Sequence, residues 1–237
     1  MRLGMVIDLD RCIGCRTCAV ACKSHNSQPP GTWWNRVFTP GSNWHQSPVG
    51  KDGNLQMNFL PVSCQMCDNP PCQKVCPVGA TFTDERGVVL VDYERCIGCR
   101  YCMSACSYGV RQFNWEEGQK AKDKAKYMKG YDYGCSEDYR TEDDHLVYTQ
   151  DRPKGVVEKC TFCAQYTKNG ELPACVRSCP AKARFFGDLD DPDSEVSRLV
   201  HARYTFRLLE DLGTAPKIFY LPPTKPIRWE LSKDEKK

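Results

Sequence analysis

The stretch RCIGCRTCAVAC at residues 11–22 places four cysteines at intervals of three, three and four residues. The stretch RCIGCRYCMSAC at residues 95–106 repeats this arrangement, and the residues before it also match. Over the longer span, VIDLDRCIGCRTCAVAC at 6–22 aligns without a gap with LVDYERCIGCRYCMSAC at 90–106. The chain therefore contains an internal repeat built around a C-x2-C-x2-C-x3-C motif.

Two further cysteine groups share a second motif, which ends in Cys-Pro. The group at 64–77 reads C-x2-C-x4-C-x3-C-P, and the group at 160–180 reads C-x2-C-x11-C-x3-C-P. The two motifs alternate along the chain and use sixteen of the 17 cysteines, so that only Cys135 is left over. The four groups are Cys12, Cys15, Cys18 and Cys22; Cys64, Cys67, Cys72 and Cys76; Cys96, Cys99, Cys102 and Cys106; and Cys160, Cys163, Cys175 and Cys179.

These spacings suit cubane [4Fe-4S] clusters, which need one thiolate for each of four irons. A tight loop wraps three corners of a cubane, and in ferredoxin-type runs the fourth cysteine ligates the neighbouring cluster, which predicts clusters in pairs. Gly14 and Gly98 allow the loop to bend and to bring N–H groups toward sulfur. Ile13 and Ile97 are placed to shield a cluster from water. The sequence therefore predicts iron–sulfur sites in two related pairs.

Zinc is the main competing ligand, since four-thiolate zinc sites also use C-x2-C pairs. A zinc ribbon separates its two pairs by many residues, whereas this chain twice supplies three cysteines within seven residues, which favours clusters. A disulfide scaffold fits poorly, because it is typical of short secreted chains. Two interpretations stay open for Arg16 and Arg100, which either offset cluster charge or are ordinary surface arginines, and for Cys135, which is either a partly buried thiol or a replacement ligand.

Composition excludes several classes of function. The chain of 237 residues has 33 Lys and Arg against 30 Asp and Glu, so it lacks the strongly basic character of a nucleic-acid-binding protein. Its opening, MRLGMVIDLD, predicts no signal peptide, and no apolar run reaches the length of a membrane span. We find no nucleophile triad, phosphate loop or molybdenum-site motif, and we expect the chain by itself to catalyse nothing.

The pattern between the cysteines predicts short elements. Apolar runs at 5–9 and 88–91 are typical of strands that lead into a cysteine loop, and the spacing to Cys22 and Cys106 predicts one helical turn. The long segments at 23–63 and 107–159 are expected to be functional loops or partner contacts. In the C-terminal part, residues 191–213 predict one amphipathic helix with a stripe formed by Val196, Leu199, Val200, Tyr204 and Leu208. A short strand is predicted within 215–226, followed by a frayed tail.

Together with the order of the quartets, the segments MRLGMVIDLDRCIGC, CPVGA, CTFC, FGDLDDP and KIFYLPP resemble a known family over nearly the whole chain. It is the four-cluster iron–sulfur subunit of the molybdopterin oxidoreductases, which include the dimethyl sulfoxide, polysulfide, thiosulfate, tetrathionate and arsenate reductases. The resemblance implies four [4Fe-4S] clusters. It implies the ligand sets Cys12, Cys15, Cys18 and Cys179; Cys160, Cys163, Cys175 and Cys22; Cys64, Cys67, Cys72 and Cys106; and Cys96, Cys99, Cys102 and Cys76.

The resemblance also implies an α+β fold in which one ferredoxin-like module is inserted within another. On this plan, 1–62 are the first half of the outer module with a Trp-rich insertion and 63–118 are the inserted module. Residues 119–155 are an insertion loop, 156–192 the second half of the outer module, and 193–237 the C-terminal helix, strand and tail.

The implied function is the relay of single electrons between a large molybdenum- or tungsten-pterin catalytic subunit and either a quinone-linked membrane subunit or a soluble carrier. The implied location is the periplasm, by co-export with a partner that bears a twin-arginine signal, or else the cytoplasm. A free polyferredoxin, or the electron-input subunit of a formate dehydrogenase or hydrogenase complex, is the alternative. A zinc-stabilised interaction module would instead contain no acid-labile sulfide.

Overall fold

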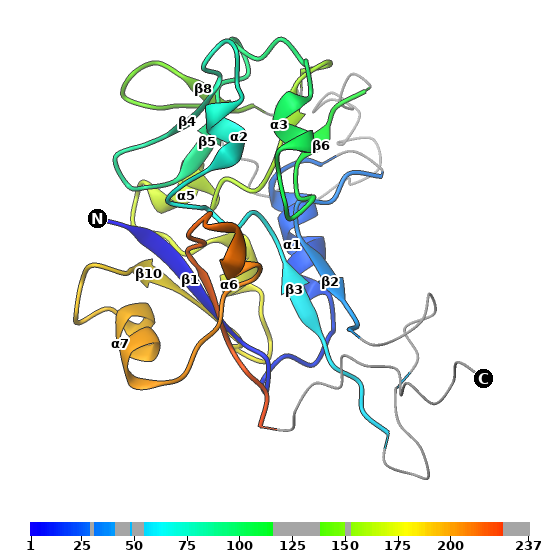
Figure 1. Cartoon of the computed structure of the whole chain (residues 1–237), viewed down its shortest axis with the longest axis vertical. Coiled ribbons are helices and arrows are strands. Elements are labelled where there is room, and N and C mark those ends of the chain that lie inside the picture. The colour runs from blue at the N-terminus through cyan, green and yellow to red at the C-terminus, as the bar shows by residue number, and fades with distance from the viewer. Residues whose placement is uncertain (29–30, 41–47, 49–54, 116–137, 150–152, 225–237) are drawn as a thin grey trace, which may run out of the picture.

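The computed structural model describes residues 1–28, 31–40, 48, 55–115, 138–149 and 153–224. The chain is a mixed α+β protein whose short elements form two groups (Figure 1). The upper group contains α2 (Pro71–Lys74), β4 (Thr81–Thr83), β5 (Val89–Val91), α3 (Tyr101–Ser104), β6 (Gln112–Phe113) and β8 (Leu146–Tyr148). The lower group contains β1 (Leu3–Asp8), α1 (Thr17–His25), β2 (Arg36–Phe38), β3 (Leu60–Val62), α6 (Ala174–Arg177), β10 (Arg184–Asp188) and α7 (Glu195–Ala202). Within the described ranges, no helix has the length and hydropathy needed to cross a membrane.

The lower group is organised on a three-stranded sheet in the order β10-β1-β11, where β11 spans Ile218–Leu221. Strand β1 pairs antiparallel with β10 and parallel with β11, so the two ends of the described chain meet in one sheet. All six residues of β1 are buried, because α7 covers one face of the sheet and the cysteine loops cover the other. The predicted strands at 5–9 and within 215–226 are therefore confirmed.

An aspartate lies where the strand before each C-x2-C-x2-C loop ends: Asp8 is the last residue of β1, and Asp92 directly follows β5. The buried carboxylate of Asp8 accepts hydrogen bonds from the main-chain N–H groups of Asp10 and Arg11, and that of Asp92 accepts one from Glu94. A side-chain oxygen that accepts N–H groups two or three residues ahead fixes a tight turn. These aspartates thus turn the chain from the strand into the cysteine loop in both repeats.

The segments between the cysteine groups carry strands that the sequence analysis did not place. Strand β2 pairs with β3, β6 pairs with β9 (Val157–Glu158), and β7 (Tyr139–Arg140) pairs with β8, all antiparallel. Each has only two or three residues, too few for a period-two pattern to stand out in the sequence. The predicted helical turns are present as α1 and α3, and α2 and α6 end just before each Cys-Pro step. The remaining short helices are α5 (Ala164–Thr167) and the 3-10 helix η1 (Glu210–Leu212).

The single helix predicted over 191–213 is wrong in its length. Helix α7 ends at Ala202, Arg203 is extended, and Tyr204 is 78% exposed. The chain leaves the helix because Phe206 forms an antiparallel bridge with Tyr220 of β11, with N–H···O distances of 3.0 and 2.8 Å, and the two rings stack. The apolar periodicity of the sequence thus corresponds to a helix only as far as Val200, because after that point pairing with a distant strand outweighs helix propensity.

The tryptophans of the first long segment have different environments. Trp34 is buried beside Cys22, whereas Trp33 lies partly exposed under the ammonium group of Lys23. Trp44, the lysine-rich run at 120–129, Cys135 and the tail after 224 lie outside the described residues.

Gly14 and Gly98 occupy equivalent left-handed turns, with φ of +68° and +70°. A Cβ at Gly14 would overlap the ring of Phe59, and a Cβ at Gly98 would overlap the main-chain oxygen of Gly155. The main chain is held on both sides of this oxygen, because the N–H of Gly155 donates to the Asn114 oxygen at 2.8 Å and the Val156 oxygen accepts from the Asn114 N–H at 2.9 Å. Glycine is therefore required at each position both by the positive φ and by the lack of space for a Cβ. The atoms that the Cβ would meet can move aside at Gly14, where they belong to a side chain, but not at Gly98, where they belong to main chain.

We expect Gly98→Ala to lower the thermal unfolding midpoint of the cluster-loaded protein more than Gly14→Ala does. Both substitutions force a side chain into the left-handed region, which costs about 1–2 kcal/mol. Only Gly98→Ala also clashes with main chain, whereas the Phe59 ring can rotate away. Gly170→Ala is the matched control, since Gly170 has φ of +78° and open space around it. A midpoint for Gly98→Ala equal to that for Gly170→Ala would contradict the steric argument.

Candidate cluster sites

Among the described residues, four cavities are each lined by four cysteines, and we number them in the order in which they adjoin. Cavity 1 is lined by Cys12, Cys15, Cys18 and Cys179. Cavity 2 is lined by Cys22, Cys160, Cys163 and Cys175. Cavity 3 is lined by Cys64, Cys67, Cys72 and Cys106. Cavity 4 is lined by Cys76, Cys96, Cys99 and Cys102.

Every cavity combines three cysteines of one sequence group with one cysteine from another. Helix α1 shows how this arises, because Cys18 faces cavity 1 while Cys22, one turn later on the same helix, lines cavity 2. Likewise, Cys175 lies in the first turn of α6 and Cys179 lies two residues after the end of this helix, and the two cysteines line different cavities. The four sets that the structure brings together have the same members as the four sets implied by the family resemblance.

The order of the cavities follows from contacts between them. The Arg184 guanidinium reaches both Cys18 of cavity 1 and Cys175 of cavity 2. The Cys64 thiol of cavity 3 is close enough to Cys160 of cavity 2 to affect its pKa, and Arg111 interacts with Cys72 of cavity 3 and Cys102 of cavity 4. The cavities thus form a row from 1 to 4.

The donor set fits an iron–sulfur cluster rather than a single ion. Among the described side chains, no group of three or more Cys, His, Asp or Glu is spaced to hold one metal ion. A four-thiolate zinc site requires sulfurs about 2.3 Å from a common centre. Here each quartet of sulfurs surrounds a cavity, which is the arrangement needed by a ligand with four separate metal corners.

The electrostatics of the cavities favour an occupant that carries positive metal ions. Burial raises the pKa of Cys67 to about 12 and that of Cys163 to about 12, and neighbouring thiolates add to both shifts. Such thiols keep their protons at neutral pH unless a metal replaces them, because only the thiolate is a ligand. The same burial that would disfavour free thiolates therefore makes them good ligands for iron.

Main-chain N–H groups point at several sulfurs. The N–H of Ala183 donates to Cys179 Sγ at 3.3 Å, and that of Phe162 donates to Cys160 Sγ at 3.5 Å. Burial alone would raise the pKa of Cys76, but N–H groups of residues 78–81 outweigh it and lower that pKa. Hydrogen bonds to sulfur stabilise negative charge and are one of the ways in which a protein sets cluster potential.

The two end cavities differ from the two inner ones in their exposure. Cys15 of cavity 1 and Cys99 of cavity 4 are exposed, as are the neighbouring Ile13 and Ile97, each 63% exposed. The isoleucines that were expected to exclude water therefore line their cavities but also face outward. Arg16 and Arg100 are exposed as well, and Arg100 lies over the rings of Phe113 and Trp115.

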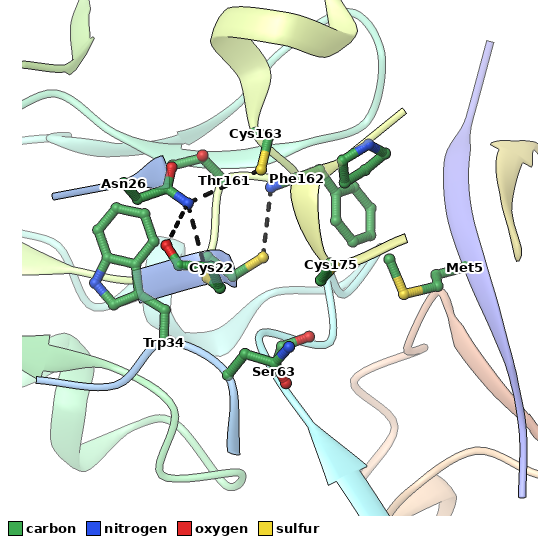
Figure 2. Close-up of a pocket in the computed structure, with 12 residues that line it drawn as sticks. Met5, Cys22, Asn26, Trp34, Ser63, Thr161, Phe162, Cys163 and Cys175 are labelled. Carbon is green, nitrogen blue, oxygen red and sulfur yellow. Dashed lines mark hydrogen bonds between the residues drawn. The ribbon is translucent and has the colours of Figure 1, made fainter. Parts of the chain in front are cut away.

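Two amides of the first long segment contact cavity 2, and the sequence analysis did not identify them. Figure 2 shows the Asn26 amide directed toward Cys22 and Cys163, with N···Sγ distances of 3.7 and 3.9 Å. Gln28 donates to Cys22 Sγ at 3.2 Å, and its oxygen accepts the N–H of Trp34 at 3.0 Å. In the sequence, these two amides are marked only by the run of polar residues directly after Cys22, and such a run is also typical of an ordinary loop.

Arg111 and Arg184 were also missed, although each lies five residues after the last cysteine of its group. Both are buried among thiols, Arg184 at 4% and Arg111 at 3% exposure. Burial disfavours the charge of Arg111, but Cys72, Cys102 and Cys64 outweigh it and raise its pKa. The pKa of Arg184 is likewise raised, because Cys175 and Cys18 outweigh its burial. Both arginines are therefore permanent positive charges beside the cavities.

Two family models of a 4Fe-4S dicluster domain match the chain, one over residues 11–80 and the other over residues 55–142 and 144–189. A Halobacterium salinarum protein, provisionally named as an iron-sulfur subunit of dimethyl sulfoxide reductase, is 44% identical over 98% of this chain and 84% of its own length. The arsenate respiratory reductase iron-sulfur subunit ArrB of Shewanella sp. is 38% identical over 93% of this chain and 96% of its own. A tetrathionate reductase subunit of Salmonella typhimurium is 38% identical over 93% of this chain and 72% of its own.

Cysteine-lined cavities and two dicluster matches define an iron–sulfur electron-transfer protein with multiple [4Fe-4S] clusters. The chain belongs to the family of iron–sulfur subunits of the molybdopterin oxidoreductases that act as dimethyl sulfoxide, selenate, arsenate and tetrathionate reductases.

We expect Gln28→Leu to lower the midpoint potential of one cluster only, the one nearest Cys22. Loss of the donor to Cys22 Sγ removes stabilisation of the reduced, more negative state. A shift of about 59 mV corresponds to a tenfold change in the reduced-to-oxidised ratio at a fixed potential. EPR-monitored redox titration measures this shift, and the signals of the other clusters serve as internal controls. An equal shift in all signals would show a general structural effect instead.

Proposed function

We propose that this chain is a four-cluster electron relay in which each cavity binds one [4Fe-4S] cluster through its four cysteines. The observation that carries the proposal is the presence of four cavities, each lined by four cysteines drawn from two distant parts of the chain. A bound cluster supplies one-electron redox chemistry. The role of the protein is to hold the sulfurs, to donate hydrogen bonds to them and to keep water out of the inner cavities.

We further propose the nested arrangement, in which an inserted module (63–118) lies within an outer module (1–62 and 156–192), with an insertion loop at 119–155 and a C-terminal part at 193–237. Two observations support it. Cavities 3 and 4 use only cysteines from 64 to 106, whereas cavities 1 and 2 use cysteines from both sides of that stretch. The pairing of β1 with β10 and β11 also joins the first strand to segments that follow the last cysteine group.

The partners follow from the family and from the exposed ends of the row. Relatives are named as subunits of reductases, and one is named the iron-sulfur cluster-binding subunit of a menaquinone reductase. We propose a large molybdenum- or tungsten-pterin catalytic subunit as one partner, and a quinone-linked membrane subunit or a soluble carrier as the other. The exposed Cys15 and Cys99 support this, because a cluster near the surface can exchange electrons with a docked protein. Co-export to the periplasm with a twin-arginine partner is the proposed route, with the cytoplasm as the alternative location.

The first test is to measure iron, acid-labile sulfide, zinc, molybdenum and tungsten in protein purified anaerobically from its native host. We expect about sixteen irons and sixteen sulfides per chain, from four cubanes, together with molybdenum or tungsten in a large companion chain. Four cubanes without any companion would support a free polyferredoxin instead. Zinc without sulfide would overturn the cluster assignment.

Cys179→Ser and Cys175→Ser form a matched pair that tests the ligand sets. The two cysteines lie four residues apart, one in α6 and one just after it, but line different cavities. We expect Cys179→Ser to alter the EPR signal of the cluster held by Cys12, Cys15 and Cys18, and Cys175→Ser to alter that of the cluster held by Cys160 and Cys163. If both substitutions affected the same signal, the proposed cross-ligation would be wrong.

Removal of iron is expected to unfold much of the chain. Helices α2, α3, α5 and α6 have four residues each, far fewer than an isolated helix needs. Metal-binding energy in such a protein is folding energy. Chelation under reducing conditions should therefore abolish the near-UV circular dichroism and expose the chain to protease, while reductant alone should do neither. An iron-free chain that kept its thermal transition would contradict this prediction.

A further inference from the structure

Each boundary between successive cavities contains one buried cation. Arg184 lies between cavities 1 and 2, where it donates to Cys18 Sγ at 3.5 Å and to Cys175 Sγ at 3.7 Å. Arg111 lies between cavities 3 and 4, where it lines cavity 3 and interacts with Cys72 and Cys102.

Lys159 occupies the remaining boundary, between cavities 2 and 3. Its ammonium group donates to the main-chain oxygen of Val89, which lines cavity 3, and at 2.8 Å to that of Cys160, which lines cavity 2. Burial raises the pKa of Cys72 in cavity 3, and the charges of Arg111 and Lys159 act against that rise. Lys159 is 1% exposed.

In the part of the chain that the structure describes, these three cations lack the usual counter-ion. No carboxylate there lies within ion-pair distance of Arg184, Lys159 or Arg111. The Arg111 guanidinium donates to the Thr81 hydroxyl at 3.2 Å, and among the described residues it also interacts with the thiols of Cys72 and Cys102. Burying a charge is strongly unfavourable unless an opposite charge compensates it. The concentrated negative charge that all three cations can share is that of the thiolate quartets on either side.

We propose that Arg184, Lys159 and Arg111 set the reduction potentials along the row, each by stabilising the added electron on the two clusters that flank it. This inference rests on the proposed function. A cubane with four thiolates is anionic and becomes more so on reduction, so a nearby fixed cation favours the reduced state. Because the cations are buried, salt screens their effect only weakly. The two inner clusters receive this stabilisation from two cations each, and the two end clusters from one.

The test uses the complex purified from its native host, with Arg184→Gln, Lys159→Gln and Arg111→Gln variants and EPR-monitored redox titration. Signals are assigned to cavities with the Cys→Ser variants. Arg184→Gln should reduce the reduced-to-oxidised ratio of clusters 1 and 2 about tenfold at a fixed potential, a shift of about 59 mV, and leave clusters 3 and 4 unchanged. Lys159→Gln should shift clusters 2 and 3, and Arg111→Gln clusters 3 and 4.

The controls separate charge from structure. Arg184→Lys and Arg111→Lys keep the charge and should retain the wild-type potentials. Arg16→Gln and Arg100→Gln remove exposed arginines that line the end cavities, and any shift they cause should shrink at high salt, unlike those of the buried cations.

Iron and sulfide content of each variant shows whether its clusters are loaded. Fully loaded Gln variants with unchanged potentials, or with all four clusters shifted equally, would overturn the inference. If a Gln variant fails to load, its charge-retaining counterpart decides, which is Arg184→Lys, Arg111→Lys or, for the lysine, Lys159→Arg. A tenfold change in a loaded, charge-retaining variant would also overturn the inference. A wild-type chain without four clusters would instead refute the proposed function itself.

Discussion

Sixteen thiols are gathered in four quartets, and all except Cys15 and Cys99 are buried or half-buried. Thiols in such an environment are unfavourable as free thiolates, and most of this structure serves to make them favourable as ligands. Burial raises thiol pKa values, as at Cys67 and Cys163, so that each quartet needs positive charge among its sulfurs. Iron in a cluster supplies most of that charge. Around it, main-chain N–H groups, the amides of Asn26 and Gln28 and the guanidinium of Arg184 all point positive ends at sulfur.

The same constraint explains why regular secondary structure is so limited. The hydrophobic core is continuous with the cysteines, since Cys18, Cys64, Cys72 and Cys175 are among its members. Clusters that crosslink distant segments can hold two- and three-residue strands and four-residue helices that would not persist alone. The sheet β10-β1-β11 with α7 is the one larger unit within the described ranges, and it anchors both ends of the described chain beside cavity 1.

The internal repeat preserves the local geometry and varies the surroundings. Asp8 and Asp92 turn the chain in the same way, and Arg16 and Arg100 both adopt left-handed backbone conformations before the helix. The neighbours of the two repeats differ. Gly14 faces a phenyl ring, whereas Gly98 faces a peptide oxygen. Asp8 interacts with Arg203, whereas Asp92 interacts with His145. Identical cysteine loops can therefore hold sites of different electrostatic character.

The cysteine motifs, the repeat, the strands that lead into it and the turn that separates Cys18 from Cys22 could all be predicted from the sequence, because they depend on spacing within a few residues. The family resemblance added the four ligand sets. The structure of the segments between the cysteine groups depends instead on tertiary contacts. The helix predicted to Gly213 stops at Ala202 since Phe206 pairs with Tyr220, and the pairs β2-β3 and β6-β9 join segments too short to recognise alone. The roles of Gln28, Arg111, Lys159 and Arg184 likewise depend on which distant sulfurs they meet, and no local pattern encodes a contact across more than a hundred residues, such as that of Arg184 with Cys18.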